Sequence, residues 1–332
     1  MNLSTLRCRT APIAVALALA LGATACGGDD ETTDAGTTAE KLSGAVRIDG
    51  SSTVFPLSEA AAELFKEVQP DVRVTVGQSG TGGGFEKFCN GETDISDASR
   101  SIKDEEKAAC EAKGIAYEEF HVANDALTVV VNKDVDFTDC LTVDQLKKIW
   151  GPDSKVANWN QVDPSFPSKP LKLFGPGTDS GTFDYFTAEI NGEEGASRTD
   201  YSPSEDDNVI VQGVSGTPGG LGYFGFSYFE ENADKLKALQ IDGGGGCVAP
   251  SSDAAQNGTY KPLARPLFVY PAASALSSQP QVLAFVEYYV ANAEKIAEEA
   301  LFIPLNDTQK SELQADLEKL KSGAAASPSS TG

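Results

Sequence analysis

Apolar residues recur with two different spacings in the first part of the chain. Residues 45–48 (AVRI) are a short strand candidate, and residues 72–76 alternate between apolar and polar, which also predicts a strand. Between them Pro56 suits a first helical turn and Pro70 lies just past the end. The apolar face of this predicted helix consists of Leu57, Ala60, Ala61, Leu64, Phe65 and Val68. A strand–loop–helix–strand order predicts the start of a parallel α/β sheet.

The two patterns continue through the rest of the chain. Strands are predicted at 126–132, 171–174 and 265–271. A helix is predicted at 142–151, where Thr142 and Gln145 form a capping box and Gly151-Pro152 is a stop. Residues 207–229 predict a helix, a glycine-rich turn and a strand, and long helices are predicted at 281–301 and 308–320. No repeat of fixed period is present.

Both ends of the chain differ in composition from the body. Residues 1–25 contain two arginines and an apolar run too short for a membrane span, which predicts a secretory signal peptide. Cys26 resembles the cysteine of a bacterial lipobox, which becomes a lipidated N-terminus, although Ala23 stands where leucine is usual. Ordinary cleavage nearby is the alternative. Residues 26–43 predict a flexible tether and 323–332 a disordered tail, which leaves roughly 280 residues for one large domain or two modest ones.

The chain is strongly acidic. Its formal charge of −23 becomes −25 when residues 1–25 are removed, because they hold two arginines and no acid. Nucleic-acid binding needs a basic surface and is not expected. If the ligand is an anion, the overall field repels it, so local dipoles and donors must hold it.

Six cysteines are present; Cys8 leaves with the signal peptide and Cys26 would carry lipid, which leaves Cys89, Cys110, Cys140 and Cys247. An even remainder in an exported protein predicts disulfides, and three pairings are possible. We favour Cys89–Cys110, which is local, with Cys140–Cys247, which then closes the other half of the molecule. No CxxC motif occurs and His121 is the single histidine, so neither a metal nor a cofactor is expected.

Three loops share one design. GSSTV (50–54), GQSGTGGG (77–84) and TDSGTF (178–183) each follow a predicted strand and precede a predicted helix. A helix N-terminus leaves backbone N–H groups free and carries partial positive charge, and hydroxyls and glycines allow close approach to an anion. Few basic residues lie near these loops in the sequence. Arg100 supplies one formal positive charge with a fork suited to phosphate, and its alternative role is a surface ion pair.

Five segments together resemble the substrate-binding protein of bacterial phosphate ABC importers: GSSTVFPLSEAAAELF, GQSGTGGGFEKF, DISDASRSI, GPGTDSGTFDYF and DDNVIVQGVSGTPGGLGYFGFSYF. The resemblance runs from about residue 44 to 320. It implies an α/β, two-lobed type II periplasmic-binding-protein fold with a hinge and an interdomain ligand cleft. We expect one lobe at 44–125 plus 262–322 and the other at 126–261. The implied function is high-affinity binding of phosphate outside the cytoplasm and its delivery to an ABC import permease.

The resemblance also implies ligand residues. The three loops contribute Ser52, Thr53, Ser79, Gly80, Thr81, Ser180, Gly181 and Thr182. Some family members place an arginine just before the third loop, where this chain has Pro176 and Gly177, so its role is assigned to Arg100. A carboxylate that accepts the proton of phosphate would reject sulfate. Asp125 is the candidate for that role and Asp97 the alternative.

Several other functions remain open at this point. The fold would also suit another oxyanion, such as molybdate, tungstate or sulfate, or a sensory or adhesion module. DSGT matches an aspartic-protease pattern, but Asp49 is a poor second copy. A serine hydrolase would need His121 as its base, and no GxSxG motif occurs. We expect a binding protein rather than an enzyme, monomeric, exported, and held at the outer face of the cytoplasmic membrane only by lipid on Cys26.

Overall fold

Nine strands form the main sheet of the structure, a computed structural model that describes residues 41–321. Eight of them follow the order β2 (Val72–Gln78), β1 (Gly44–Gly50), β3 (Ile95–Ala98), β12 (Ala264–Pro271), β4 (Phe120–Asn132), β8 (Gly220–Gly225), β6 (Lys172–Pro176) and β7 (Ser202–Ser204). The ninth, β9 (Leu236–Ala238), pairs with β4. A separate three-stranded sheet has the order β11 (Cys247–Val248), β10 (Gln240–Asp242) and β5 (Cys140–Thr142).

The predicted parallel start of the sheet is confirmed. Strand β1 pairs in parallel with β2 from Gly44↔Val72 to Gly50↔Gln78, and it pairs in parallel with β3 on its other edge. Because parallel strands need a crossover, helices connect them: α1 (Phe55–Val68) after β1 and α2 (Gly80–Cys89) after β2. The ends of β1 and β2 that carry the first two loops therefore lie at the same edge of the sheet.

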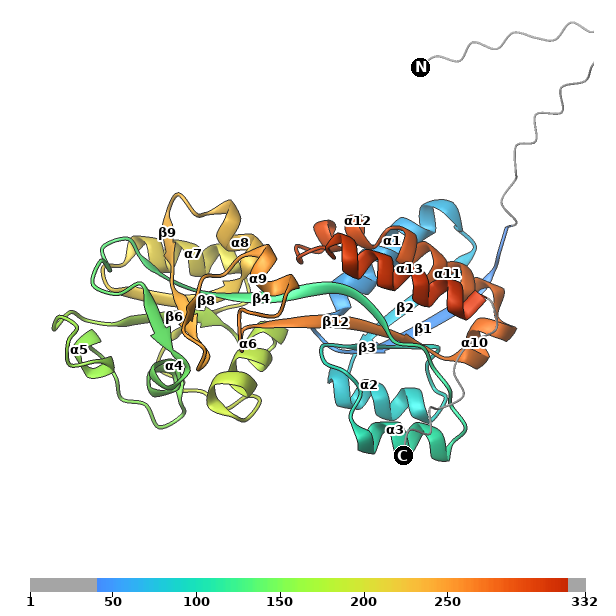
Figure 1. Cartoon of the computed structure of the whole chain (residues 1–332), viewed down its shortest axis with the longest axis horizontal. Helices are drawn as coiled ribbons and strands as arrows, with labels where there is room; N and C mark the ends of the chain where they lie inside the picture. The colour runs from blue at the N-terminus through green and yellow to red at the C-terminus, as the bar shows by residue number, and fades with distance from the viewer. Residues whose placement is uncertain (1–40, 322–332) are drawn as a thin grey trace, which may run out of the picture. The chain divides into compact units, whose positions relative to one another are not determined.

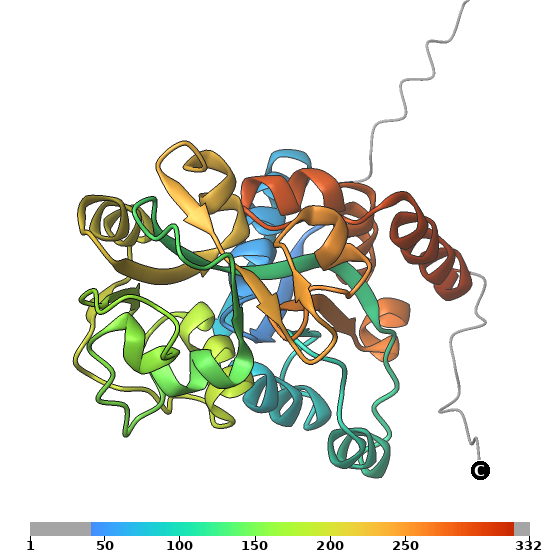
Figure 2. The same cartoon turned by 60° about the vertical axis from the view of Figure 1, so that its left-hand side comes forward.

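Helices cover both faces of these strands. Figures 1 and 2 show α1 with α11 (Pro280–Ala291), α12 (Ala293–Glu299) and α13 (Asp307–Lys321) on one face, and α2 with α3 (Asp104–Ala112) on the other. The remaining elements of the chain are α4 (Val143–Trp150), α5 (Trp159–Val162), α6 (Gly181–Phe186), the π-helix η1 (Thr187–Asn191), α7 (Asp207–Gly216), α8 (Phe226–Glu231), α9 (Ser252–Gln256) and α10 (Ala273–Ser278).

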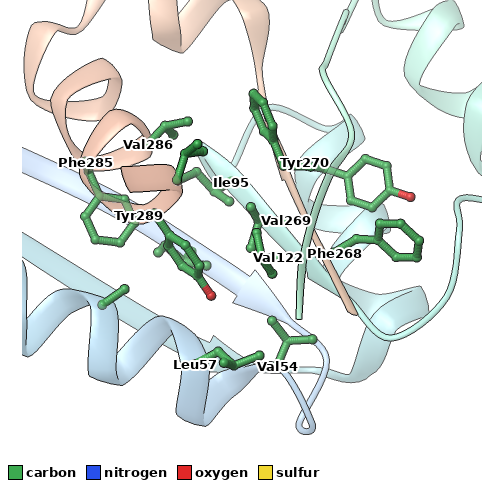
Figure 3. Close-up of a cluster of buried hydrophobic side chains, with 14 of the residues drawn as sticks. Val54, Leu57, Ile95, Val122, Phe268, Val269, Tyr270, Phe285, Val286 and Tyr289 are labelled. Atoms are coloured by element: carbon green, nitrogen blue, oxygen red, sulfur yellow. The ribbon is translucent and has the colours of Figure 1, made fainter. Parts of the chain in front are cut away.

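Residues 41–321 belong to one compact unit, which holds two large hydrophobic cores. The first core draws on residues 46–123 and 267–317. Figure 3 shows part of it, with Leu57 of α1 and Phe285 and Tyr289 of α11 packed around the strands. The second core draws on residues 126–263 together with Ile303. A third, smaller cluster packs α7 against β8.

Strands β4 and β12 run between the two cores (Figure 1). The first half of β4 pairs with β12 as far as Ala126↔Ala264, and its second half pairs with β8 from Leu127↔Gly225. The sequence predicts only residues 126–132 as strand, because Asn124 and Asp125 interrupt the apolar run. Both side chains are nevertheless buried, because the strand crosses the interior at that point.

The predicted helices form, with several differences. Residues 281–301 form two helices, because Asn292 ends α11 by donating from its side-chain amide to the Tyr288 carbonyl at 2.8 Å. Val68, expected on the buried face of α1, is 54% exposed. Helix α3, like α5, α9 and α10, has no counterpart among the predicted elements; Cys110 is the single buried residue of α3, so α3 has no apolar face. The capping box of α4 is confirmed by reciprocal hydrogen bonds between Thr142 and Gln145.

Both favoured disulfides are present. Cys89–Cys110 joins α2 to α3, and Cys140–Cys247 joins β5 to β11. Among residues 41–321 no helix is both long and apolar enough to cross a membrane. The predicted signal peptide, Cys26, most of the predicted tether and the predicted C-terminal tail lie outside the described residues.

Candidate anion-binding site

The three predicted loops meet at one cavity of about 910 Å³. Of the residues predicted to hold phosphate, Ser52, Thr53, Ser79, Gly80, Thr81, Arg100 and Gly181 line it. Asp125, Ser180 and Thr182 do not. The cavity draws its lining from elements of both cores, because the first two loops follow β1 and β2 and the third follows β6.

The first loop is shaped by Ser51, a residue the sequence analysis does not single out. Its side-chain oxygen accepts hydrogen bonds from the backbone N–H groups of Thr53 and Val54, which holds the turn that leads into α1. Its own N–H donates to the Asp97 carbonyl at 2.9 Å. Gly50 has φ of 152°, and a Cβ there would lie 2.1 Å from that same carbonyl oxygen. Glycine is therefore needed for β1 and β3 to approach each other beside the loop.

In the second loop the hydroxyl groups have protein partners. The Ser79 hydroxyl donates to Asp49, which also forms an ion pair with Lys87 at 2.6 Å. The Thr81 hydroxyl lies 3.1 Å from that of Ser99 and accepts from the Ser99 N–H. For Ser79 to bind an anion, its hydroxyl must turn away from Asp49.

The third loop touches the first. A Cβ at Gly181 would lie 2.6 Å from Thr53 Oγ1 and 2.9 Å from Ser52 Oγ, so no larger residue fits in this arrangement. Ser180 caps α6, because its side chain accepts from the Thr182 N–H at 3.2 Å. Gly181 is thus the member of the predicted DSGT group that faces the cavity.

Arg100 lies at the edge of the cavity formed by α2 and α3. Its two terminal nitrogens donate to the two carboxylate oxygens of Glu106 at 2.7 and 2.8 Å. Burial alone lowers the pKa of Arg100, but the hydrogen bonds to Glu106, the largest effect, raise it above the ordinary value. Arg100 therefore lines the cavity and also forms the ion pair that is its alternative role.

Arg265 is the main residue that the sequence analysis missed. It lies at the start of β12, lines the cavity, and donates from Nη2 to Thr53 Oγ1 at 2.7 Å. Its guanidinium carbon lies 3.6 Å from the centre of the Tyr185 ring, and Tyr185 also lines the cavity. The signal in the sequence is an arginine that opens an apolar strand at the predicted junction between the lobes.

Asp125 is the partner of Arg265. Its carboxylate accepts from Arg265 Nε at 3.1 Å, and burial raises its pKa although Arg265 opposes the rise. Asp97, the alternative proton acceptor, is wholly buried and accepts from the Ser58 hydroxyl at 2.9 Å. Its other oxygen has no hydrogen-bond partner among the described residues. Neither carboxylate lines the cavity.

The charges around the cavity differ from the sequence expectation of few basic residues. Four cations line it: Arg100, Lys103, Lys261 and Arg265. Three acids accompany them: Asp184, Glu189 and Glu194. Burial raises the pKa of Asp184 and of Glu189, and the charge of Arg265 opposes both shifts. In a chain of formal charge −23 this concentration of cations makes the cavity a locally favourable place for an anion.

Comparison with known proteins agrees with this geometry. Residues 32–293 match the family described as the PBP superfamily domain. Protein SphX of Synechococcus elongatus is 54% identical over 78% of this chain and 77% of its own length. The phosphate-binding protein PstS of Staphylococcus saprophyticus is 42% identical over 92% of both chains. A crystal structure of a possible phosphate-binding protein from Planctomyces limnophilus aligns with a TM-score of 0.81 at 47% identity, covering 84% of this chain and 99% of that one.

The chain belongs to the phosphate-binding proteins of the PBP superfamily. Its fold is the α/β, two-lobed type II periplasmic-binding-protein fold that the motifs imply. This family is one of binding proteins rather than of enzymes.

In this member of the phosphate-binding proteins, the residues needed by the two enzyme alternatives lie outside the cavity lining. His121 packs against Phe268 and its Nε2 lies 3.0 Å from the Ala123 carbonyl oxygen. Asp49 and Asp179 of the protease pattern also do not line the cavity. Among residues 41–321 no cluster of histidine, cysteine, aspartate and glutamate is arranged to hold a metal ion.

Proposed function

We propose that the protein binds inorganic phosphate in this cavity and delivers it to the permease of an ABC importer. The observation that carries the proposal is that loops rich in hydroxyl groups and glycine join four cations around one cavity of an otherwise acidic protein. Names of relatives support it, since the Staphylococcus protein is a phosphate-binding protein.

The ligand set we propose is the one carried by the motifs. Ser52, Thr53, Ser79, Gly80, Thr81, Ser180, Gly181 and Thr182 supply hydroxyl and backbone donors, and Arg100 supplies charge. A hydrogen bond to a charged group contributes about 1.5–3 kcal/mol, so several together outweigh desolvation of the anion. Ser180 and Thr182 reach the anion only after the third loop moves relative to the first.

That movement is the proposed mechanism of capture. Residues 44–125 plus 262–322 form one lobe and residues 126–261 the other, and the lobes rotate about the stretch where the paired strands β4 and β12 pass between the two cores. Phosphate bridges the loops of both lobes and so stabilises the closed form, which the permease recognises. No chemical step is involved. Ile303 packs in the second core although it belongs to the first lobe in sequence, so the segment around it forms part of the hinge.

We further propose where the protein works. Residues 1–25 direct export, Cys26 carries the lipid that holds the protein at the outer face of the cytoplasmic membrane, and the protein acts as a monomer. Globomycin, which blocks cleavage of lipoprotein signal peptides, should make an unprocessed form accumulate, and Cys26→Ser should release the protein from the membrane.

Calorimetric titration tests the binding function. The exported protein, stripped of ligand by unfolding and refolding, is titrated with phosphate, sulfate and molybdate separately at neutral pH. Tight binding of phosphate with no heat from sulfate or molybdate supports the proposal. Absence of phosphate binding by folded protein contradicts it, and tight binding of molybdate or sulfate instead would identify a different oxyanion.

Gly181→Ala tests whether the cavity is the site. Its Cβ would collide with Thr53 and Ser52, so phosphate affinity should fall by more than about 10-fold. Gly216→Ala is the matched control, because a Cβ at Gly216 would meet nothing within 4 Å and the residue lies at the end of α7. Equal affinity of both variants would place the phosphate elsewhere.

A further inference from the structure

Two residues on the paired strands β4 and β12 lie directly opposite each other. Asp125 on β4 and Arg265 on β12 are partners in the antiparallel register. Their ion pair joins Arg265 Nε to Asp125 Oδ2 at 3.1 Å, and both side chains are largely buried, with 12% and 7% of their surface exposed. A buried pair of this kind is screened little by solvent, so its geometry is held more firmly than that of a surface pair.

The Arg265 guanidinium is held on three sides. Asp125 fixes Nε, the Thr53 hydroxyl of the first loop accepts from Nη2, and the Tyr185 ring lies against its face. Tyr185 belongs to α6, the helix that follows the third loop. Arg265 therefore contacts residues beside both of the loops that approach each other at Gly181.

Most of the donors of Arg265 stay available. A guanidinium has five N–H groups in a planar fork, and Arg265 uses two of them, on Nε and Nη2. Nη1 has no hydrogen-bond partner among residues 41–321, and Arg265 lines the cavity. A planar fork with free donors at a cavity wall suits an oxyanion with several acceptor oxygens.

We propose that Arg265 is a direct ligand of the bound phosphate and that Asp125 is a positioning residue that holds Arg265 in place. The inference rests on the proposed phosphate-binding function and refines it, because it makes Arg265, rather than Arg100, the principal cation of the site. It also gives Asp125 a role different from accepting the proton of phosphate, since its carboxylate faces Arg265 and does not line the cavity.

The two roles of Asp125 predict opposite behaviour toward sulfate. A carboxylate that holds an arginine in place affects the affinity for every oxyanion alike. If Asp125 has that role, Asp125→Asn should weaken phosphate binding and should not allow sulfate to bind. A carboxylate that accepts the phosphate proton repels sulfate, so the same substitution should allow sulfate to bind. Sulfate is therefore the probe that separates them.

The experiment is a double-mutant cycle measured by calorimetry. Wild type, Arg265→Met, Asp125→Asn and the double variant, each exported and processed by the host, are titrated with phosphate and with sulfate. We expect Arg265→Met to lose about 100-fold or more in phosphate affinity, Asp125→Asn about 10-fold, and the double variant no more than Arg265→Met. Arg265→Lys, which keeps the charge but not the fork, should recover part of the loss. Arg73→Met, at an exposed arginine of β2 outside the cavity, is the control.

Any other result of these titrations contradicts one of the two proposed roles, that of Arg265 or that of Asp125. Wild-type affinity in folded Arg265→Met excludes Arg265 as a ligand. A further loss on adding Asp125→Asn to Arg265→Met, or sulfate binding by Asp125→Asn, makes Asp125 a proton acceptor. Failure of the wild type itself to bind phosphate contradicts the proposed function rather than this refinement. If Arg265→Met does not fold, Arg265→Lys tests the planar fork: a partial loss of phosphate affinity supports binding through the guanidinium, and unchanged affinity contradicts it.

Discussion

Two arginine–carboxylate pairs flank the cavity and differ in how their donors are used. At the α2–α3 edge, Arg100 directs both terminal nitrogens at Glu106, at 2.7 and 2.8 Å. Where β4 pairs with β12, Arg265 donates to Asp125 only from Nε, at 3.1 Å. Its Nη1 has no hydrogen-bond partner among residues 41–321. The Arg100 side chain is 33% exposed and that of Arg265 is 12% exposed.

The difference shows that lining a cavity does not make two cations equivalent. Arg100 uses three of its five N–H donors, two toward Glu106 and one toward the Ser101 carbonyl, and solvent screens the charge it brings to an anion. Arg265 meets an anion with donors already free and with its plane fixed by Tyr185. A carboxylate bound to Nε orients an arginine without occupying the end that faces the ligand.

The first prediction concerns a buried carboxyl that lacks an arginine altogether. Asp97 has no cation partner, and burial, opposed by a hydrogen bond from Ser58 and aided by the charge of Asp49, raises its pKa to about 8. The folded state thus holds a proton that the unfolded state, with an aspartate pKa near 3.9, releases. Stability from this group is complete below pH of about 4 and is lost as the pH rises toward 8.

The Asp97→Asn substitution should therefore remove this contribution to the pH dependence of the free energy of unfolding. Between pH 5 and 8 the free energy of unfolding of the wild type should fall relative to that of Asp97→Asn by roughly 1 kcal/mol per pH unit, as measured by urea denaturation. Asp97 lies beside Tyr289, whose hydroxyl in Figure 3 is directed toward α1. Parallel pH profiles would mean that Asp97 is charged in the folded protein over this pH range despite its burial, and would contradict the raised pKa.

The second prediction compares the two arginines directly. Arg100→Met should lower phosphate affinity by about 10-fold, less than Arg265→Met, because Arg100 is more exposed and shares its donors with Glu106. Added salt should reduce the difference in phosphate affinity between Arg100→Met and the wild type. The difference in phosphate affinity between Arg265→Met and the wild type should stay nearly unchanged. Titrations at low and high salt measure both effects.

A larger loss for Arg100→Met than for Arg265→Met would reverse the ranking. It would mean that phosphate displaces Glu106 completely and that the exposed arginine is the principal cation. Arg73→Met again serves as the control for removing one positive charge from the surface.

The fold was largely predictable because its signals are local. Helical spacing around Leu57 and the Thr142–Gln145 capping box each depend on residues within a few positions of one another, and the structure has both features. The three loops were recognisable for the same reason, since each lies between a strand and a helix. The same local signals also gave one wrong boundary. The continuous apolar pattern at 281–301 predicts one helix, but α11 ends at Asn292, whose side chain donates to the Tyr288 carbonyl.

The arrangement within the site was less predictable because it depends on contacts distant in sequence. Arg265 meets Thr53 across 212 positions and Asp125 across 140. Arg100 was found because it stands within a recognisable motif, six positions from its partner Glu106. Nothing in the sequence around Ser180 distinguishes a residue that caps α6 from one that faces the cavity, whereas the structure separates Ser180 from Gly181.

The third prediction uses the partner of Arg100. Burial alone would raise the pKa of Glu106, but hydrogen bonds from Arg100 and from the Lys103 N–H outweigh it and hold the pKa below its ordinary value. Glu106 is therefore charged near neutral pH and places a negative charge beside the cavity.

Glu106→Gln removes that charge and leaves an oxygen to accept from the Lys103 N–H, so α3 keeps its capping contact. Phosphate affinity should rise by about 2- to 3-fold, the opposite sign to Asp125→Asn, because Arg100 loses a competitor for its donors while Arg265 would lose its holder. Calorimetry measures both variants, with Glu63→Gln on the exposed face of α1 as the control. A loss of affinity in Glu106→Gln would show that this carboxylate positions Arg100 as Asp125 positions Arg265, and the two pairs would then work in the same way.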